Sequence, residues 1–395
     1  MSQGGQLYVV TAGGTGGHLF PARALGLELN RRGNMVILVT DLRGEKIVAT
    51  FREFIVNFVP SGTLSAPGLA KKIGALWRIF LGTVESYSMF RKMKPAAVVG
   101  FGGYPSFPAM LAAKLAGIPI CVHEQNAVMG KANARVVPWA AAVALSFEDT
   151  KGLDRRRTKE VVVTGNPVRA EIAALRDKPY PGFGPGTKFR ILVFGGSQGA
   201  KVLTNTVPAA MAHLPDSLKK RLEVTQQCHE EDKDALILKY TEAGINATVD
   251  SFFHNIPELL ADAHLVIGRA GASTVCELAV AGRPGILVPL PSSLRDEQTA
   301  NARVLASAGG GWLIPQPEFT DAELAKRLLK LATTHHLLQE AAVDAKALGR
   351  PGAASALADL VERVAGEHAE AMMAKTAEQT GANPSSSQRK ERSGA

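Results

Sequence analysis

The chain has 395 residues, of which 46% are hydrophobic and 21% charged, and its formal net charge is +9 at pH 7. This length argues for two domains, and the composition is that of an ordinary soluble globular protein rather than a disordered or fibrous one. The positive charge predicts an anionic partner, so nucleotide, nucleic acid and an acidic membrane surface all remain candidates.

The cysteines, the N-terminal segment and the lengths of the apolar runs indicate the compartment in which the protein is found. Cys121, Cys228 and Cys276 lie far apart and form no CxxC pair, so we expect neither a disulfide framework nor a zinc site, and a reducing cytoplasm fits best. The N-terminus lacks a basic segment followed by an apolar one. No apolar run reaches the roughly 18 residues that a membrane-spanning helix needs. The sequence therefore predicts a protein that is neither secreted nor integral to a membrane.

Short β-branched runs alternate with helix-patterned segments through the first half of the chain. The runs are LYVVTA, MVILVT, AAVVGFGG, IPICVHEQN and VVVTGNP. This alternation predicts a parallel sheet with crossover helices. The segment RDKPYPGFGPGTK at 176–188 then interrupts any regular element, because it contains three prolines and three glycines.

After this linker the same pattern starts again with FRILVFGGSQGAKVL and continues with ATVDSF, LVIGRAG, PGILVPLP and GWLIPQ. We therefore expect an α/β protein with two doubly wound, Rossmann-like domains that face each other across a cleft, at residues 1–165 and 166–349. A C-terminal helix at 350–366 is expected to pack back on the first domain. Residues 367–395 have few large apolar side chains and are predicted to form a disordered tail.

The order of strand, glycine loop and helix occurs twice, at 8–29 and at 189–203. Such a loop presents unpaired backbone N–H groups and a positive helix end, which suit a phosphate. Two loops indicate a diphosphate or two charged ligands, although each could be only a tight turn. A dinucleotide-binding fold is an alternative, with Asp41 where a ribose-binding acid would lie, but Leu19 replaces the third glycine of that fingerprint.

Seven motifs follow one another in an order and spacing that resemble the MurG family of glycosyltransferases, from about residue 6 to 366. They are GGTGGHLFPA at 13–22, GFGGYPSFPAMLAA at 100–113, HEQNAVMGKAN at 123–133, GNPVR at 165–169, GGSQGAK at 195–201, RAGASTVCELAVAGRP at 269–284 and DEQTANA at 296–302. The resemblance implies the GT-B architecture. It also implies transfer of N-acetylglucosamine (GlcNAc) from UDP-GlcNAc to the N-acetylmuramic acid (MurNAc) of lipid I, undecaprenyl-pyrophosphoryl-MurNAc-pentapeptide, in peptidoglycan synthesis.

The resemblance implies that the C-terminal half binds UDP-GlcNAc. Glu277, expected in the first turn of a helix, would accept hydrogen bonds from both ribose hydroxyls, although an acid there can also merely stabilise the helix dipole. Arg169 is expected to reach the nucleotide. The uracil would contact the backbone of Phe253, and the diphosphate would contact Ser197, Ala272, Ser273 and Thr274, with Val275 and Cys276 next in the motif.

Amide side chains are the expected contacts of the donor sugar. Gln298 and Asn301 are three residues apart on an expected helix, so both can face the cleft and hydrogen-bond sugar hydroxyls. Asn126 is expected to contact the same sugar. Some members of the family have two successive glutamines, but this chain has Glu297 before Gln298, so Glu297 is left out of the expected contacts.

The acceptor and the chemistry are assigned to the N-terminal half. A phosphate would lie against the loop residues Thr15, Gly16 and Gly17. Transfer from an α-linked donor to a β link is an inversion and needs one general base. The resemblance suggests His18, while Glu124 and His123 are the next candidates, and a histidine that only packs the helix end is the structural alternative.

No metal or cofactor is expected, because helix ends and backbone amides can stabilise a departing diphosphate. The DKD at 232–234 matches the DxD of metal-dependent glycosyltransferases, but it lies in a charged run that is typical of an exposed helix.

A lipid-linked acceptor calls for an anionic membrane surface. The segment 69–94 combines Trp77 and Phe80 with Lys71, Lys72 and other cations, which is typical of an interfacial helix, although an amphipathic core helix is the alternative. We therefore expect a peripheral protein on the cytoplasmic face of the inner membrane.

Three other functions stay open at this point. A nicotinamide-dependent oxidoreductase is disfavoured by Leu19. A non-catalytic protein that binds nucleotide sugar or lipid would bind UDP-GlcNAc without turnover. Another GT-B lipid glycosyltransferase, such as one that glucosylates diacylglycerol, would share the donor motifs but not the acceptor loops. No nucleic-acid partner is expected.

Overall fold

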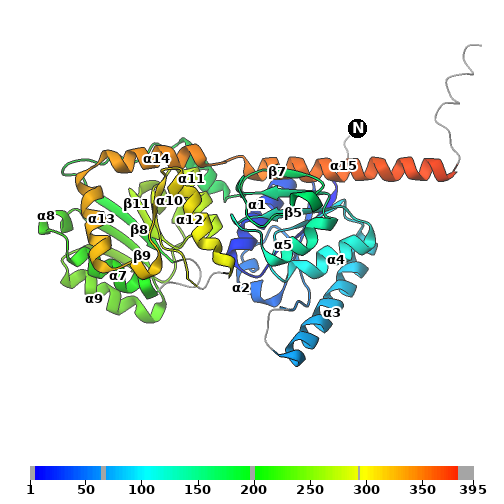
Figure 1. Ribbon diagram of the computed structural model, residues 1–395, viewed down its shortest axis with the longest axis horizontal. Coiled ribbons are helices and arrows are strands. Elements are labelled where there is room, and N and C mark those ends of the chain that lie inside the picture. Colours follow the sequence, from blue (N-terminus) through cyan, green and yellow to red (C-terminus); the bar gives the residue numbers. More distant parts are fainter. Residues whose placement is uncertain (1–4, 64–67, 196–200, 292–293, 381–395) are drawn as a thin grey trace, which may run out of the picture.

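The computed structural model describes residues 5–63, 68–195, 201–291 and 294–380, and it contains two parallel β-sheets surrounded by helices (Figure 1). Strands such as β2 (Met35–Thr40) are almost wholly apolar and buried, because both faces of a parallel sheet are covered. Two buried apolar clusters accompany each sheet. The predicted pair of doubly wound α/β domains is confirmed.

The first sheet has seven strands in the order β3-β2-β1-β4-β5-β6-β7, with Val9 of β1 beside Ile37 on one side and Val98 on the other. The remaining strands are β1 (Leu7–Thr11), β3 (Ile55–Phe58), β4 (Ala97–Gly100), β5 (Ile120–Glu124), β6 (Ala142–Leu145) and β7 (Val161–Val163). Its helices are α1 (Gly16–Arg31), α2 (Glu45–Val48), α3 (Leu69–Met93), α4 (Ser106–Ala116) and α5 (Lys131–Val136).

The second sheet has six strands in the order β10-β9-β8-β11-β12-β13. They are β8 (Phe189–Phe194), β9 (Leu222–Gln227), β10 (Asn246–Asp250), β11 (Leu265–Gly268), β12 (Gly285–Leu287) and β13 (Gly311–Leu313). The helices are α6 (Ala170–Ala173), α7 (Lys201–Ala212), α8 (Asp216–Lys219), α9 (Lys233–Glu242), α10 (Ile256–Asp262), α11 (Ala272–Ala281), α12 (Glu297–Ser307), α13 (Asp321–Thr333) and α14 (His336–Leu348).

Both strand orders reverse direction at one point, between β1 and β4 in the first sheet and between β8 and β11 in the second. At such a point the loops after two neighbouring strands separate, and ligands of doubly wound proteins bind there. The glycine loop after β1 and the motif that follows β11 both lie at these positions. The topology therefore places the predicted ligand-binding segments where this fold binds ligands.

Helix α15 (Ala353–Thr380) leaves the second domain and packs on the first, where Leu357 and Val361 join the core of β1 and β4 (Figure 1). Arg32, the C-cap residue of α1, fixes this docking through ion pairs with Asp359 at 2.6 Å and Glu362 at 2.7 Å. The helix continues to Thr380, so residues 367–380 are helical and not part of a disordered tail. Their alanine, glutamate and methionine content favours a helix. Residues 381–395 lie outside the described residues.

Helix α3 projects from the first domain, and only one stripe of it is buried, including Ala75, Ile79 and Phe90 (Figure 1). Large apolar side chains are exposed elsewhere on the helix, among them Trp77 at 60% and Phe80 at 54%. Among the described residues, no helix has the length and apolar character needed to cross a membrane.

Candidate active site

Two glycine loops meet where β1 and β4 end, and together they form one wall of a cavity of about 280 Å³, the glycine-loop cavity. The backbone N–H of Gly13 donates to the carbonyl of Gly102 at 2.9 Å. Gly103 has a φ of +77°, and a Cβ there would lie 2.7 Å from the Cα of Gly13. Only glycine allows this close approach, which leaves backbone open to a ligand.

Thr15 and His18 lie at the N-terminus of helix α1, and both line the glycine-loop cavity. Gly16 and Gly17 form the first turn of the helix beside them. The hydroxyl of Thr15 is 2.9 Å from Nδ1 of His18. Burial lowers the pKa of the His18 imidazole to about 4, so the ring is neutral at physiological pH. When the Thr15 hydroxyl accepts a hydrogen bond from Nδ1–H, Nε2 of His18 carries a free lone pair.

Glu124 ends β5, lines the same cavity and is buried, with both carboxylate oxygens fully engaged. Its Oε1 accepts from the backbone and side chain of Asn126 at 3.0 and 3.3 Å, and its Oε2 accepts from Gly130 and Asn133, both at 2.8 Å. Burial raises the pKa of Glu124 while these donors oppose the rise. A carboxylate with four donors orders the surrounding loop, so this geometry favours His18 over Glu124 as the proton acceptor.

His123, the other candidate base, is completely buried, and both ring nitrogens have protein partners. Nε2 lies 3.0 Å from the carbonyl of Gly165, and Nδ1 lies 3.2 Å from the amide of Gln125. This histidine therefore holds the end of β5 in place and does not reach a ligand.

In the second domain, Glu277 and Arg169 form a bidentate ion pair with two contacts of 2.9 Å. Helix α11 begins at Ala272, so Glu277 lies in its second turn and not in the first turn that the sequence predicted. In the second turn, Glu277 stabilises the helix dipole only weakly, because the electrostatic effect of a helix end falls off within the first turn. The guanidinium of Arg169 also lies 5.9 Å from the ring centre of Phe20 on α1, which links the two domains.

The N-terminus of α11 has Gly271 as its N-cap and no side-chain cap, so its first N–H groups are available to an anion. The hydroxyl of Ser273 is buried and has no hydrogen-bond partner among the described residues. Thr274 is half-buried in the same turn. Val275 and Cys276 have buried side chains, so any contact of theirs with a nucleotide would use the backbone.

Of the two remaining residues expected to contact the donor, the structure describes Phe253 but not Ser197. Phe253 follows β10 and is half-buried, with its neighbour Phe252 exposed at 62%. Ser197 lies outside the described residues. Lys233, within the DKD segment, pairs at 3.1 Å with Asp250 of β10.

Asn301 reaches from α12 to the first domain, and its contact with the donor sugar stays a prediction. It is completely buried: its Oδ1 accepts from the backbone of Ala127 at 2.8 Å, and its Nδ2 donates to Asn126 at 3.0 Å and to the carbonyl of Ala270 at 3.2 Å. The reason is that α12 packs directly against the 126–127 loop of the first domain. Gln298 uses its Oε1 to accept from the backbone N–H of Leu290 at 3.0 Å, and its amide N–H groups have no hydrogen-bond partner among the described residues.

Residues 8–145 match the glycosyltransferase family 28 N-terminal domain, and residues 190–364 match the glycosyltransferase family 28 C-terminal domain. The chain is 30% identical to a crystal structure of Acinetobacter baumannii MurG, with a TM-score of 0.74 over 91% of this chain and 99% of that one. The chain belongs to the MurG family of glycosyltransferases. Its two parallel sheets have the GT-B fold of that family, and a nicotinamide-dependent oxidoreductase is no longer supported.

Two further relatives extend over nearly the whole chain. A UDP-N-acetylglucosamine--N-acetylmuramyl-(pentapeptide) pyrophosphoryl-undecaprenol N-acetylglucosamine transferase from Rhodospirillum centenum is 50% identical over 91% of this chain and 94% of its own. The protein of the same name from Zymomonas mobilis is 46% identical over 92% and 94%. A UDP-GlcNAc 2-epimerase from Neisseria meningitidis, at 15% identity and a TM-score of 0.63, shares the fold alone.

This MurG-family chain has four charged residues in the glycine-loop cavity that the sequence did not predict there: Arg43, Lys131, Arg295 and Glu297. Arg295 and Asp296 have φ values of 60° and 55°, a strained conformation for residues other than glycine. Burial, followed by the charge of Glu124, raises the pKa of Glu297 to about 7. Sequence carries no signal for these placements, because Arg295 and Glu297 cross from the second domain into a cavity of the first.

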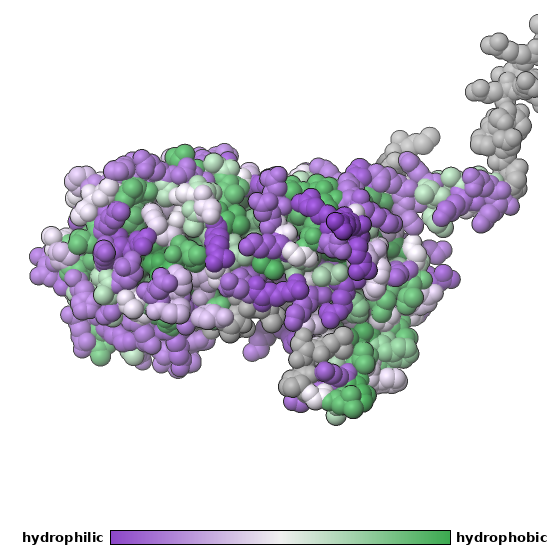
Figure 2. Space-filling view, viewed as in Figure 1, coloured by the Kyte–Doolittle hydropathy of each residue, from purple (hydrophilic) through white to green (hydrophobic). Residues whose placement is uncertain are grey.

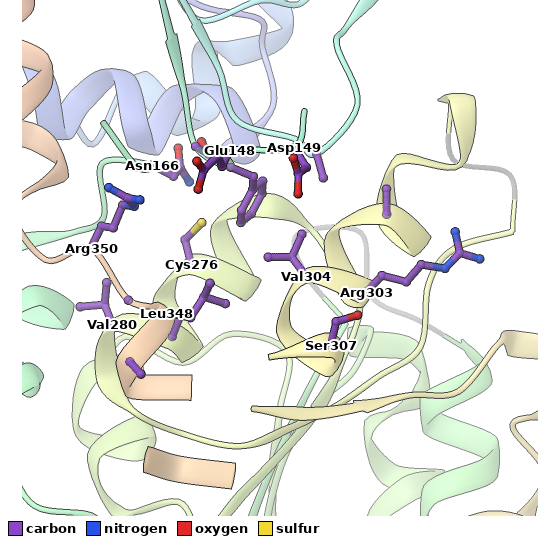
Figure 3. Close-up of a pocket in the computed structure, with 18 of the residues that line it drawn as sticks. Glu148, Asp149, Asn166, Cys276, Val280, Arg303, Val304, Ser307, Leu348 and Arg350 are labelled. Atoms are coloured by element: carbon purple, nitrogen blue, oxygen red, sulfur yellow. The ribbon is translucent and has the colours of Figure 1, made fainter. Parts of the chain in front are cut away.

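A separate cavity of about 540 Å³, the junction cavity, lies between the two domains (Figure 3). Cys276 and Val304 approach it from the second domain and Asn166 and Glu148 from the other side, as the close-up shows. Burial raises the pKa of the Cys276 thiol to about 12, so it stays protonated. In this family member the junction cavity lies beside α11 and α12 and is distinct from the glycine-loop cavity.

Proposed function

We propose that this chain is the MurG enzyme that transfers GlcNAc from UDP-GlcNAc to the 4-hydroxyl of MurNAc in undecaprenyl-pyrophosphoryl-MurNAc-pentapeptide. The product of this inverting reaction is lipid II of peptidoglycan synthesis. The observation that carries the proposal is 50% identity over 91% of the chain to a transferase of that name, together with a built cavity at the predicted catalytic loop.

The donor is bound by the second domain. Its ribose hydroxyls hydrogen-bond the lone pairs of Glu277 that Arg169 leaves free, and its diphosphate lies at the N-terminus of α11 beside Ser273 and Thr274. The bidentate pair supports this role because it fixes the plane of the carboxylate. The uncapped helix end and the unpaired hydroxyl of Ser273 support the diphosphate position.

The acceptor sugar occupies the glycine-loop cavity. Its 4-oxygen attacks C1 of GlcNAc, the bond from C1 to the UDP oxygen breaks, and UDP leaves with the electron pair. Nε2 of His18 takes the hydroxyl proton, while Thr15 holds the proton on Nδ1. The helix dipole of α11 stabilises the charge that develops on UDP.

Helix α3 binds the anionic surface of the cytoplasmic face of the inner membrane. The exposed apolar side chains lie close together on it, and the rings of Trp77 and Phe80 stack with centres 5.5 Å apart. Figure 2 shows hydrophobic surface along this projecting helix. Lys71, Lys72 and Arg78 supply the cations. A helix that served only the core would not expose aromatic rings in this way.

The direct test is to incubate the purified full chain with UDP-GlcNAc and a lipid I analogue in detergent, and to look for the disaccharide product. Formation of the GlcNAc-MurNAc product supports the proposal. Binding of UDP-GlcNAc without turnover would support a non-catalytic nucleotide-sugar-binding protein. Sugar transfer to diacylglycerol, with no transfer to the lipid I analogue, would support another GT-B lipid glycosyltransferase.

A further inference from the structure

A groove of about 950 Å³, the α3 groove, runs between helix α3 and the segment that follows β3. Lys71, Ala75 and Arg78 line it from the helix, and residues 58–63 line it from the other side. Val59 and Ala75 are buried beneath it, so it has an apolar floor and a charged rim. None of the contacts described for the catalytic site uses this groove.

Arg43 lines both the α3 groove and the glycine-loop cavity, so the two spaces meet at this side chain. Its position is fixed: Nε donates to Asp41 at 2.7 Å and Nη2 to Ser61 at 3.3 Å, while Ser61 donates to the same carboxylate at 2.7 Å. Asp41 is thereby committed to orienting Arg43. A ligand that extends from the cavity into the groove must pass this guanidinium.

The rim of the groove has an excess of unpaired positive charge. Lys71 and Arg78 are exposed, and neither has a hydrogen bond or an ion pair among the described residues. Glu85 is the acid that also lines the groove, since Asp41 is paired with Arg43. Two free cations and a fixed guanidinium around an apolar floor suit an anionic head joined to a hydrocarbon chain.

The groove also borders the membrane-binding face of α3. Trp77 and Phe80, which are exposed, lie on the same helix as Lys71, Gly74 and Arg78 of the groove rim. The groove therefore connects the face proposed to contact lipid with the cavity proposed to hold the acceptor sugar.

We propose that the α3 groove binds the diphosphate and the first isoprene units of the polyprenyl acceptor, between the membrane surface and the catalytic cavity. Arg43, Lys71 and Arg78 neutralise the diphosphate, and the hydrocarbon chain lies on the apolar floor toward the exposed face of α3. This inference rests on the proposed function, because it assumes a lipid-diphosphate acceptor.

The test compares Lys71→Ala and Arg78→Ala with wild type in a detergent assay without vesicles. Each substitution is expected to raise the KM for the undecaprenyl-diphosphate acceptor by roughly 3- to 10-fold, the loss of one exposed charged contact, with the Kd for UDP unchanged. Lys46→Ala is the control, because Lys46 of α2 is an exposed lysine of the same domain that does not line the groove. It should leave the KM as in wild type.

Two further measurements separate this binding from general surface charge. With an acceptor whose diphosphate is replaced by a neutral linker, Lys71→Ala should be no worse than wild type. Gly74 lines the groove, and a Cβ added there meets no atom within 4 Å. Gly74→Leu should therefore fold, narrow the groove and raise the KM for the long-chain acceptor more than for a ten-carbon one.

Equal effects of Lys71→Ala and Lys46→Ala, or an unchanged KM in the Lys71, Arg78 and Gly74 variants, would overturn the α3 groove assignment while leaving the proposed function intact. If the wild-type protein forms no product with any of these acceptors, the proposed function fails, and the groove assignment fails with it.

Discussion

Arg169 and Glu277 form a bidentate ion pair in which Nε lies 2.9 Å from Oε1 and Nη2 lies 2.9 Å from Oε2. The two side chains are 26% and 13% exposed, so the pair is largely shielded from water. A carboxylate offers about four lone-pair positions, and Arg169 uses two of them. The other two can accept both ribose hydroxyls without breaking the pair, which makes Arg169 the residue that orients Glu277.

Glu277→Ala is expected to weaken UDP binding by about 1–3 kcal/mol, because a charged hydrogen-bond partner is lost. Titration calorimetry with UDP measures the loss. The preference for UDP over TDP should shrink in the same variant, since the 2′-hydroxyl contacts this carboxylate. Arg169→Lys keeps the positive charge without the planar fork, so an intermediate loss is expected. UDP binding as tight as in wild type would show that the ribose lies elsewhere.

His18→Ala is expected to reduce turnover by roughly 10² to 10⁴ while UDP affinity stays close to wild type, because a positioned base acts mainly in the transition state. Thr15→Val, which removes the partner of Nδ1, should cause a smaller loss of the same kind. Steady-state kinetics with saturating donor gives both values. Near-normal turnover in His18→Ala would transfer the role to another group in the cavity or to a water.

Glu297 is expected to make acceptor binding depend on pH. The pKa of this carboxyl, raised to about 7, means that it gains a proton as the pH falls from 8 to 6. Arg43, Lys131 and Arg295 line the same cavity, and Glu124 accepts four hydrogen bonds there. Loss of one negative charge favours an anionic acceptor, so its KM should fall several-fold on acidification.

Glu297→Gln should remove this pH dependence and keep a low KM at both pH values. Asp296→Asn, which changes the neighbouring exposed carboxylate, should behave like wild type. A KM that varies with pH equally in wild type and in Glu297→Gln would assign the titration to a different group.

Asn301→Ala is expected to lower the free energy of unfolding by about 1–3 kcal/mol, because the N–H of Ala127 and the carbonyl of Ala270 lose a buried partner. Denaturant unfolding followed by fluorescence gives the change. Thr299→Ala on the same helix is the control and should cost less than about 0.5 kcal/mol. If both variants unfold at the same denaturant concentration as wild type, Asn301 does not hold the two domains together.

The exposed face of α3 should bind vesicles in two separable ways. Replacing Trp77 and Phe80 by serine should reduce co-sedimentation with vesicles at high salt, because the apolar contribution is insensitive to salt. Reversing the charges of Lys71, Lys72 and Arg78 should abolish the dependence on anionic lipid, since each cation contributes about 1 kcal/mol within a Debye length. If both variants bind cardiolipin-containing vesicles as wild type does, or if the variant with serine at positions 77 and 80 unfolds, α3 is an amphipathic helix of the core and not a membrane-binding helix.

The sequence by itself determined the fold class and the positions of the ligand loops. Alternating apolar strands and amphipathic helices are local patterns. A glycine-rich loop such as GGTGG at 13–17 also indicates, from its own residues alone, a place where another group can approach the backbone closely. The order and spacing of the seven motifs also indicated the protein family. These features depend on residues close together in the chain, so they can be read without coordinates.

Only the tertiary structure decided how distant residues meet. The sequence placed Asn301 in the cleft by helical spacing, and the packing of α12 on the 126–127 loop buries it between the domains. The sequence omitted Glu297, whose raised pKa arises from burial beside Glu124, a residue 173 positions earlier in the chain. Periodicity fixes which face of a helix a side chain lies on, whereas burial and charge depend on what the fold brings against that face.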